Sequence, residues 1–168
     1  RWVCFRNACA YVSKAVLVMK KKMFPGPLTN EDVRRAEADI FRSVQIGLTN
    51  NKDYEVFLST LAPFIDEHGV LRMRGRAARA ENLPFEARFP VIVVGDHPAI
   101  RLLIQHYHQQ NGHQNVTTVV NELQQKVRMP QMKTCVRRVI SLCRLCAVRR
   151  TKPIAPQLSA LPLSRIAV

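Results

Sequence analysis

The sequence predicts a mainly α-helical fold with a small β-hairpin region. Apolar residues recur at three- and four-residue steps along several segments, which is the spacing of one helix face. Strand-like runs are short and lie in the middle of the chain, between clusters of Pro and Gly. Of the 168 residues, 47% are hydrophobic, which is enough to build a core and excludes a wholly disordered chain.

Residues 1–60 are predicted to form a helical region. A first helix spans residues 2–22 and ends in three lysines, which suit the C-terminal end of the helix dipole. A second helix follows the Pro-Gly-Pro break, with Thr29 or Asn30 as its N-cap, and a short helix is expected near residues 54–60. The apolar positions of the first helix are Trp2, Phe5, Cys9, Val12, Val16 and Met19. Those of the second are Val33, Ala36, Ile40, Val44 and Leu48.

Residues 61–96 are predicted to form a β-hairpin and an extension. The apolar pairs on either side of residues 66–69 read as two strands joined by a turn that ends in Gly69. A further strand-like run covers residues 89–94.

Residues 97–150 are predicted to form three helices that include a helix-turn-helix. The first of them begins at Pro98, a residue favoured at the first helical position, and ends at Asn111-Gly112. Its buried positions are Ile100, Leu103, Ile104 and Tyr107. The next runs from a cap at Asn115 or Thr117 to about Val127, and the last covers residues 133–146. Residues 151–168 are expected to form a Pro-rich linker.

A metal site is predicted from two histidines and two cysteines, His108, His113, Cys143 and Cys146. Two imidazoles and two thiolates are a standard tetrahedral set for structural zinc, and four protein ligands leave no position for a catalytic water. The break at Asn111-Gly112 would place His108 on the last helical turn and His113 on the loop that folds back. One zinc ion would then close the three-helix bundle by joining its entrance to its exit.

Other histidines and cysteines are weaker candidates. His106 could replace His108 but points to another face of the helix, and His97 is better placed as a helix cap. Cys135 lies on the apolar stripe of the last helix, which favours a core thiol. Packing is also expected for Cys4 and Cys9. Two buried cysteines without metal remain the alternative reading of Cys143 and Cys146.

The net charge of +14 predicts a polyanionic partner. Residues 1–98 carry 15 basic and 11 acidic side chains, a net of +4, whereas residues 99–168 carry 11 basic side chains and one acid, Glu122, a net of +10. Since solvated surfaces normally mix both signs, contact with DNA phosphates is expected in the second part. The candidate contacts are Lys133, Arg137, Arg138, Arg144, Arg149, Arg150 and Lys152.

The run from residue 102 to His113, followed by residues 136–139 and Cys143-x-x-Cys146, resembles the His-His-Cys-Cys zinc-binding domain of retroelement integrases. The closest likeness is to the BEL/Pao class of LTR retrotransposons, and it covers about residues 60–168. In two places the chain departs from the family, with Gln114 where glycine is usual and Val127-Arg128 where a Tyr-Trp pair is usual.

The resemblance implies a noncatalytic N-terminal part of an integrase that contacts the ends of the element's DNA and joins integrase protomers. The strand-transfer chemistry would belong to a ribonuclease-H-like core, expected after Val168 in a longer polyprotein. An alternative is a host-retained zinc module for DNA or protein interaction. No enzyme activity, membrane segment or small-molecule substrate is expected. The protein is expected to be intracellular, in the nucleus at integration and otherwise in the cytoplasm.

Overall fold

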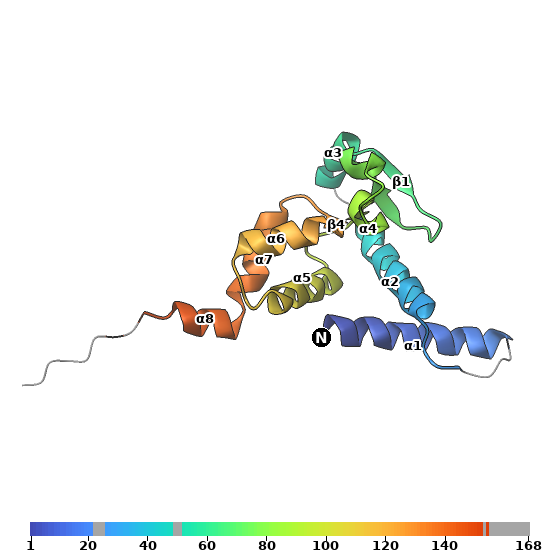
Figure 1. Cartoon of the computed structure of the whole chain (residues 1–168), viewed down its shortest axis with the longest axis horizontal. Coiled ribbons are helices and arrows are strands. Elements are labelled where there is room, and N and C mark those ends of the chain that lie inside the picture. The colour runs from blue at the N-terminus through green and yellow to red at the C-terminus, as the bar shows by residue number, and fades with distance from the viewer. Residues whose placement is uncertain (22–25, 49–51, 153, 155–168) are drawn as a thin grey trace, which may run out of the picture.

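The computed structural model describes residues 1–21, 26–48, 52–152 and 154. Within them the chain is mostly helical, with a small sheet of short strands (Figure 1). The helices are α1 Trp2–Lys21, α2 Asn30–Gln45, α3 Lys52–Thr60, α4 Phe85–Arg88, α5 Pro98–Gln110, α6 Val116–Gln124, α7 Met132–Ser141 and α8 Arg144–Arg150. The strands are β1 Pro63–Ile65, β2 Leu71–Met73, β3 Val91–Ile92 and β4 Val127–Arg128. Two 3-10 turns cover Ile46–Leu48 and Arg76–Arg79. Among the described helices, none is both long and apolar enough to span a bilayer.

Helices α1 and α2 pack against each other and support the rest of the molecule. Thr29 caps α2: its hydroxyl accepts from the Asp32 N–H, and the Asp32 carboxylate accepts from the Thr29 N–H. Lys14 of α1 donates to the same carboxylate at 2.8 Å. The capping prediction is therefore confirmed, with Thr29 rather than Asn30 as the cap.

The predicted apolar face of α1 is largely not buried. Trp2 is 2% exposed and Cys9 is half-buried, whereas Val12 is 65% and Met19 79% exposed. The other residue that α1 buries is Ala10, which lies outside the predicted set. The apolar spacing thus predicted the helix correctly but not the face that packs.

The hairpin and the parallel strand pair connect the two halves of the chain. Strands β1, β2, β3 and β4 lie in that order, antiparallel except for the parallel pair β3–β4. The predicted hairpin is confirmed, with Gly69 in the left-handed conformation at φ +72°. Strand β4 was predicted as the end of a helix, so that prediction is wrong by three residues, since α6 ends at Gln124.

The last predicted helix is two helices in the structure. Helix α7 ends at Ser141, and α8 begins at Arg144 after the extended residue Cys143, whose ψ is 115°. The apolar spacing continues across the break, which explains the error. In Figure 1, α8 projects away from the bundle formed by α5, α6 and α7.

The larger of two buried hydrophobic clusters among the described residues joins the N-terminal helices to α5. Its buried members include Trp2 of α1, Phe41 of α2, Val70 of the hairpin and Leu103 of α5. The sheet and α5 therefore connect the N-terminal helices to the region from α5 to α8, called the zinc-ligand region below because it contains the four predicted metal ligands. The predicted division into four segments remains a prediction.

Candidate metal centre

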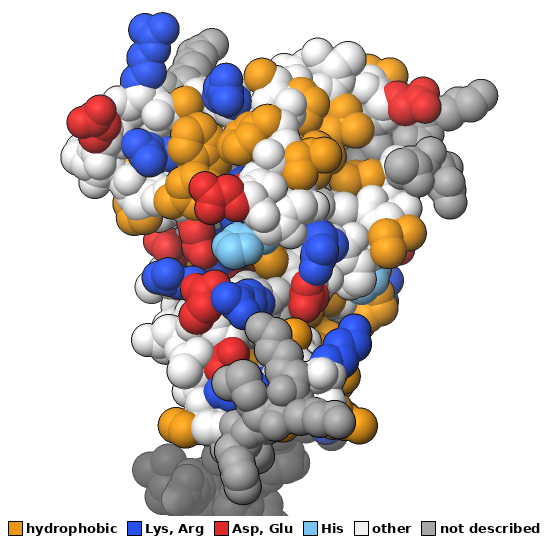
Figure 2. Space-filling model, turned by 90° about the vertical axis from the view of Figure 1, so that its right-hand side faces the viewer, with side chains coloured by type: hydrophobic (Ala, Val, Ile, Leu, Met, Phe, Trp, Pro, Cys, Tyr) orange, Lys and Arg blue, Asp and Glu red, His pale blue; other side chains and the backbone are white. Residues whose placement is uncertain are grey.

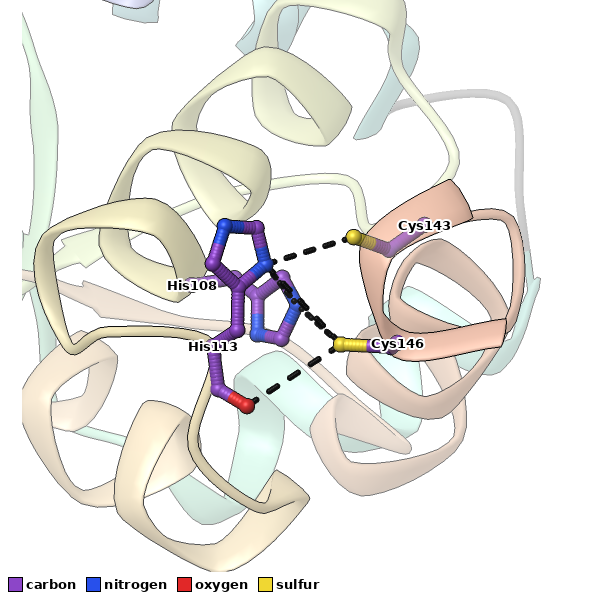
Figure 3. Close-up of side chains that lie close together, drawn as sticks. All are labelled: His108, His113, Cys143 and Cys146. Atoms are coloured by element: carbon purple, nitrogen blue, oxygen red, sulfur yellow. Dashed lines mark hydrogen bonds between the residues drawn. The ribbon is translucent and has the colours of Figure 1, made fainter. Parts of the chain in front are cut away.

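Four side chains from two distant parts of the chain converge between the end of α5 and the start of α8 (Figure 3). His108 lies on the last full turn of α5, and His113 lies on the loop that follows it. Cys143 lies at the break between α7 and α8, and Cys146 lies on the first turn of α8. The predicted ligand set is thus brought together as the sequence indicated, although Cys143 lies between two helices rather than near the end of one.

The distances between the four ligand atoms fit a tetrahedral ion. His108 Nε2 lies 3.1 Å from Cys146 Sγ and 3.2 Å from His113 Nδ1. Cys143 Sγ lies 3.3 Å and Cys146 Sγ 3.9 Å from the same His113 Nδ1. All four atoms lie within 4.8 Å of one another. Zinc–nitrogen bonds of about 2.0–2.1 Å and zinc–sulfur bonds of about 2.3 Å would separate neighbouring ligand atoms by roughly 3.3–3.8 Å.

Burial suits a structural ion. His108 is 1% exposed and Cys146 is 5% exposed, while His113 and Cys143 are half-buried. Four protein donors complete a tetrahedron, so the arrangement can hold zinc but leaves no position for a reacting water. Such an ion would cross-link α5 and the loop that follows it to the start of α8.

The protonation of the ligands is compatible with metal binding. Burial lowers the pKa of His108, and His113 and Arg150 act in the same direction, which favours the neutral imidazole that a metal ligand requires. The backbone N–H of Cys146 donates to the Cys143 sulfur and lowers the pKa of that thiol despite its burial. Burial raises the pKa of Cys146, and the neighbouring Cys143 adds to this effect. A divalent cation between them would favour both thiolates.

Backbone geometry turns His113 toward His108. Gly112 has φ +61° and His113 has φ +63°, and the His113 N–H donates to the His108 carbonyl at 2.9 Å. A left-handed conformation costs a non-glycine residue about 1–2 kcal/mol, which metal binding can offset. Gln114 is not among the described residues with positive φ, so the turn does not need the glycine that the family usually has there.

The rival candidates lie outside the ligand cluster. His97 caps α5 by accepting from the Ala99 N–H, as predicted, and His106 is half-buried elsewhere on α5. Cys135 is half-buried against the core, and Cys9 packs at its edge. The prediction that Cys4 is packed is wrong, because its side chain is exposed.

The seven predicted DNA contacts are all exposed. Lys133, Arg137 and Arg138 lie on α7, and Arg144, Arg149 and Arg150 lie on α8, with Lys152 just beyond. Arg144 was placed on the same helix as Arg137 and in fact belongs to the next one. Within the part of the chain that the structure describes, two of the seven have partners: Arg138 pairs with Asp96 at 3.1 Å, and Arg149 donates to the Gly112 carbonyl at 3.5 Å.

Residues 96–152 match the family model of the integrase zinc binding domain. The match contains all four ligands and confirms the resemblance for this part of the chain. No curated protein and no solved structure matches the chain. The ligand cluster and the family match together support one structural zinc ion, bound by His108, His113, Cys143 and Cys146.

Proposed function

We propose that this chain is the noncatalytic N-terminal part of a retrotransposon integrase, of the BEL/Pao class, that contacts the element's DNA and joins integrase protomers. The match to the integrase zinc-binding domain supports the general assignment. Three parts of the proposal go beyond the family match: DNA contact, a role in joining protomers, and a location in the nucleus during integration.

The exposed basic side chains of α7 and α8 are the observation that carries the DNA contact. Those of α8 lie on the helix that carries Cys146, and residues 99–168 contain a single carboxylate, Glu122. The opposite arrangement is seen on the face that Figure 2 shows, where acidic and basic side chains lie next to one another. A surface rich in basic side chains beside a metal centre suits phosphate binding, mostly without base readout.

The apolar face of α8 supports contact with another protomer. Leu145 and Val148 lie three residues apart on α8 and are 55% and 72% exposed, and Leu142, which is 80% exposed, lies in the break just before this helix. Exposed apolar side chains that align on one helix face are typical of protein interfaces. Replacing Leu145 with Asp should lower the mass measured by light scattering if this face holds protomers together, and an unchanged mass would contradict that role.

Salt-dependent DNA binding tests the proposed contact. Neither Arg137 nor Arg144 has a side-chain hydrogen bond or ion pair among the described residues, so both are available to contact phosphate. Since phosphate contacts carry no sequence information, we expect Arg137→Gln/Arg144→Gln to weaken binding to all duplex sequences alike. If both contact phosphate, the slope of log K against log salt should become shallower by roughly 1.8. Fluorescence anisotropy over a salt titration measures both quantities.

A matched control makes the result specific. The double variant Arg34→Gln/Arg79→Gln removes the same charge from two exposed positions in the first part of the chain. It should leave the slope nearly unchanged. Equal slopes for the α7–α8 variant and the unmodified chain would show that these arginines are only solvated.

A further inference from the structure

A groove of about 850 Å³ lies between the middle of the chain and the zinc-ligand region. Helix α3, the end of β2 and helix α4 form one wall, and the end of α6, strand β4 and the start of α7 form the other. Figure 1 shows α3 and α4 beside the end of the bundle where β4 lies. The groove is separate from the metal ligands and from the predicted DNA contacts.

Three methionines contribute to the apolar lining of this groove, although Met129 and Met132 are only 5% and 8% exposed. Met73 comes from the hairpin, and Met129 and Met132 come from the chain that leads into α7. Thioether side chains are flexible and polarisable, so surfaces that contain them adapt to varied apolar side chains. Phe57 supplies the aromatic ring among the described lining residues, which leaves little platform for stacking nucleic-acid bases.

Three arginines face the groove without an acidic partner. Among the described residues, no hydrogen bond or ion pair joins the side chain of Arg74, Arg88 or Arg128 to an acceptor, and the Nε atoms of Arg88 and Arg128 are buried and unpaired. Two of these arginines lie over aromatic rings. The Cζ atom of Arg74 is 5.3 Å from the ring centre of Phe64, and that of Arg88 is 5.3 Å from the ring centre of Phe89.

The absence of carboxylates sets this groove apart. No described residue that lines it is Asp or Glu. Two other hollows of similar or smaller size mix both signs: one contains Glu37 and Glu86, and the other contains Asp39 and Glu67. Guanidinium groups without acceptors favour a ligand that brings carboxylates with it.

We propose that this groove binds an acidic peptide segment of a partner protein. Apolar side chains of that segment would pack against the half-buried lining residues Phe57, Leu61 and Met73. Its Asp or Glu side chains would accept hydrogen bonds from Arg74, Arg88 and Arg128, which supply positive charge on an otherwise apolar surface.

A labelled peptide in which leucine and phenylalanine alternate with aspartate is the probe. Binding to the zinc-loaded full chain is followed by fluorescence anisotropy. We expect saturable binding that weakens at least roughly tenfold in Arg74→Gln/Arg128→Gln, because hydrogen bonds to charged groups are lost. The control Arg34→Gln/Arg79→Gln, which removes two exposed arginines outside the groove, should bind as the unmodified chain does.

The peptide itself provides a second measurement that does not depend on the variant folding. Replacing each aspartate by asparagine keeps the shape and removes the charge, and should weaken binding to the unmodified chain by a similar factor. Equal affinity for both peptides, or for both arginine variants, would overturn the proposal. So would a single-stranded DNA oligonucleotide that loses affinity in Arg74→Gln/Arg128→Gln while the acidic peptide does not bind.

Discussion

Cys135 and Cys143 lie eight residues apart and have different surroundings. Cys143 caps α8 and faces the two histidines, whereas Cys135 lies against Gly95, where an added Cβ would come within 2.7 Å of its sulfur. Burial raises the pKa of the Cys135 thiol. Residue type and spacing were sufficient to separate the two cysteines, since only Cys143 has a second cysteine three residues away and histidines across a helix break.

Replacing Cys143 with Ser should abolish stable zinc binding, whereas Cys135→Ser should retain one equivalent per chain. The serine hydroxyl is a poor ligand at neutral pH, and three remaining ligands leave the tetrahedron incomplete. Metal analysis of protein purified without chelator measures both. Zinc lost with Cys135→Ser, or retained with Cys143→Ser, would contradict the assigned ligand set.

Asp66 is a residue whose importance the sequence did not reveal. Its carboxylate lies in the hairpin turn and accepts from the N–H groups of His68 and Val70 and from Arg72. Burial raises the pKa of Asp66, but the hydrogen bonds from Arg72 and from the backbone N–H groups together lower it by more. The net effect is a lowered pKa. Nothing in a strand-like pattern predicts such a contact, because it depends on how the turn closes.

We expect Asp66→Asn to lower the free energy of unfolding by about 3 kcal/mol, because it leaves the buried Arg72 guanidinium without its carboxylate. The folded pKa of Asp66 lies below its unfolded value, so the stabilisation is complete above that unfolded value, about 3.9, and is lost as the pH falls through the folded pKa. Urea unfolding at neutral and acidic pH should therefore show a difference that shrinks in acid. Glu67→Gln is the control, because Glu67 is exposed in the same turn.

At the scale of elements, the sequence predicted helices better than their ends. The caps and breakers of α2 and α5 were readable because Thr, Asn, Pro and Gly have local effects on the backbone. The break between α7 and α8 has no Gly or Pro, and the spacing continues across it at steps of four, three and three residues through Val136, Ile140, Cys143 and Cys146. Strand β4 is two residues long and has no periodicity, so only its pairing with β3 defines it.

The cap of α2 gives a prediction at this scale. Thr29→Ala should lower the free energy of unfolding by about 1 kcal/mol, because the Asp32 N–H loses its acceptor at the helix start. Asn30→Ala should have little effect, since Asn30 is exposed and already helical. Thermal unfolding of the two variants compares them directly. Equal destabilisation, or a larger effect at Asn30, would show that the cap is misassigned.

At the scale of the whole molecule, the metal centre and the N-terminal helices share one core. Trp2 and Phe41 pack 6.4 Å apart, ring centre to ring centre, and belong to the same buried cluster as Leu103 and Ile104 of α5. A salt bridge adds to this contact, since Lys126 lies 2.6 Å from Glu37 of α2. This packing could not be predicted from the sequence, because contacts between distant segments leave no periodic pattern.

Zinc removal should therefore be felt at Trp2, the single tryptophan of the chain. Structural zinc contributes roughly 10–16 kcal/mol in small domains, comparable to the total stability of about 5–15 kcal/mol of a folded protein. When a chelator removes the ion, α8 and the end of α5 lose their cross-link, and the core that covers Trp2 loses one side. We expect the fluorescence maximum to shift to longer wavelength together with a loss of helical circular dichroism, and both to recover when zinc is restored.

Cys143→Ser should show the shifted spectrum without chelator, and Cys135→Ser should not. If chelation reduces the helical signal while the emission of Trp2 stays unchanged, the N-terminal helices fold independently of the metal centre, and the shared core does not transmit its loss.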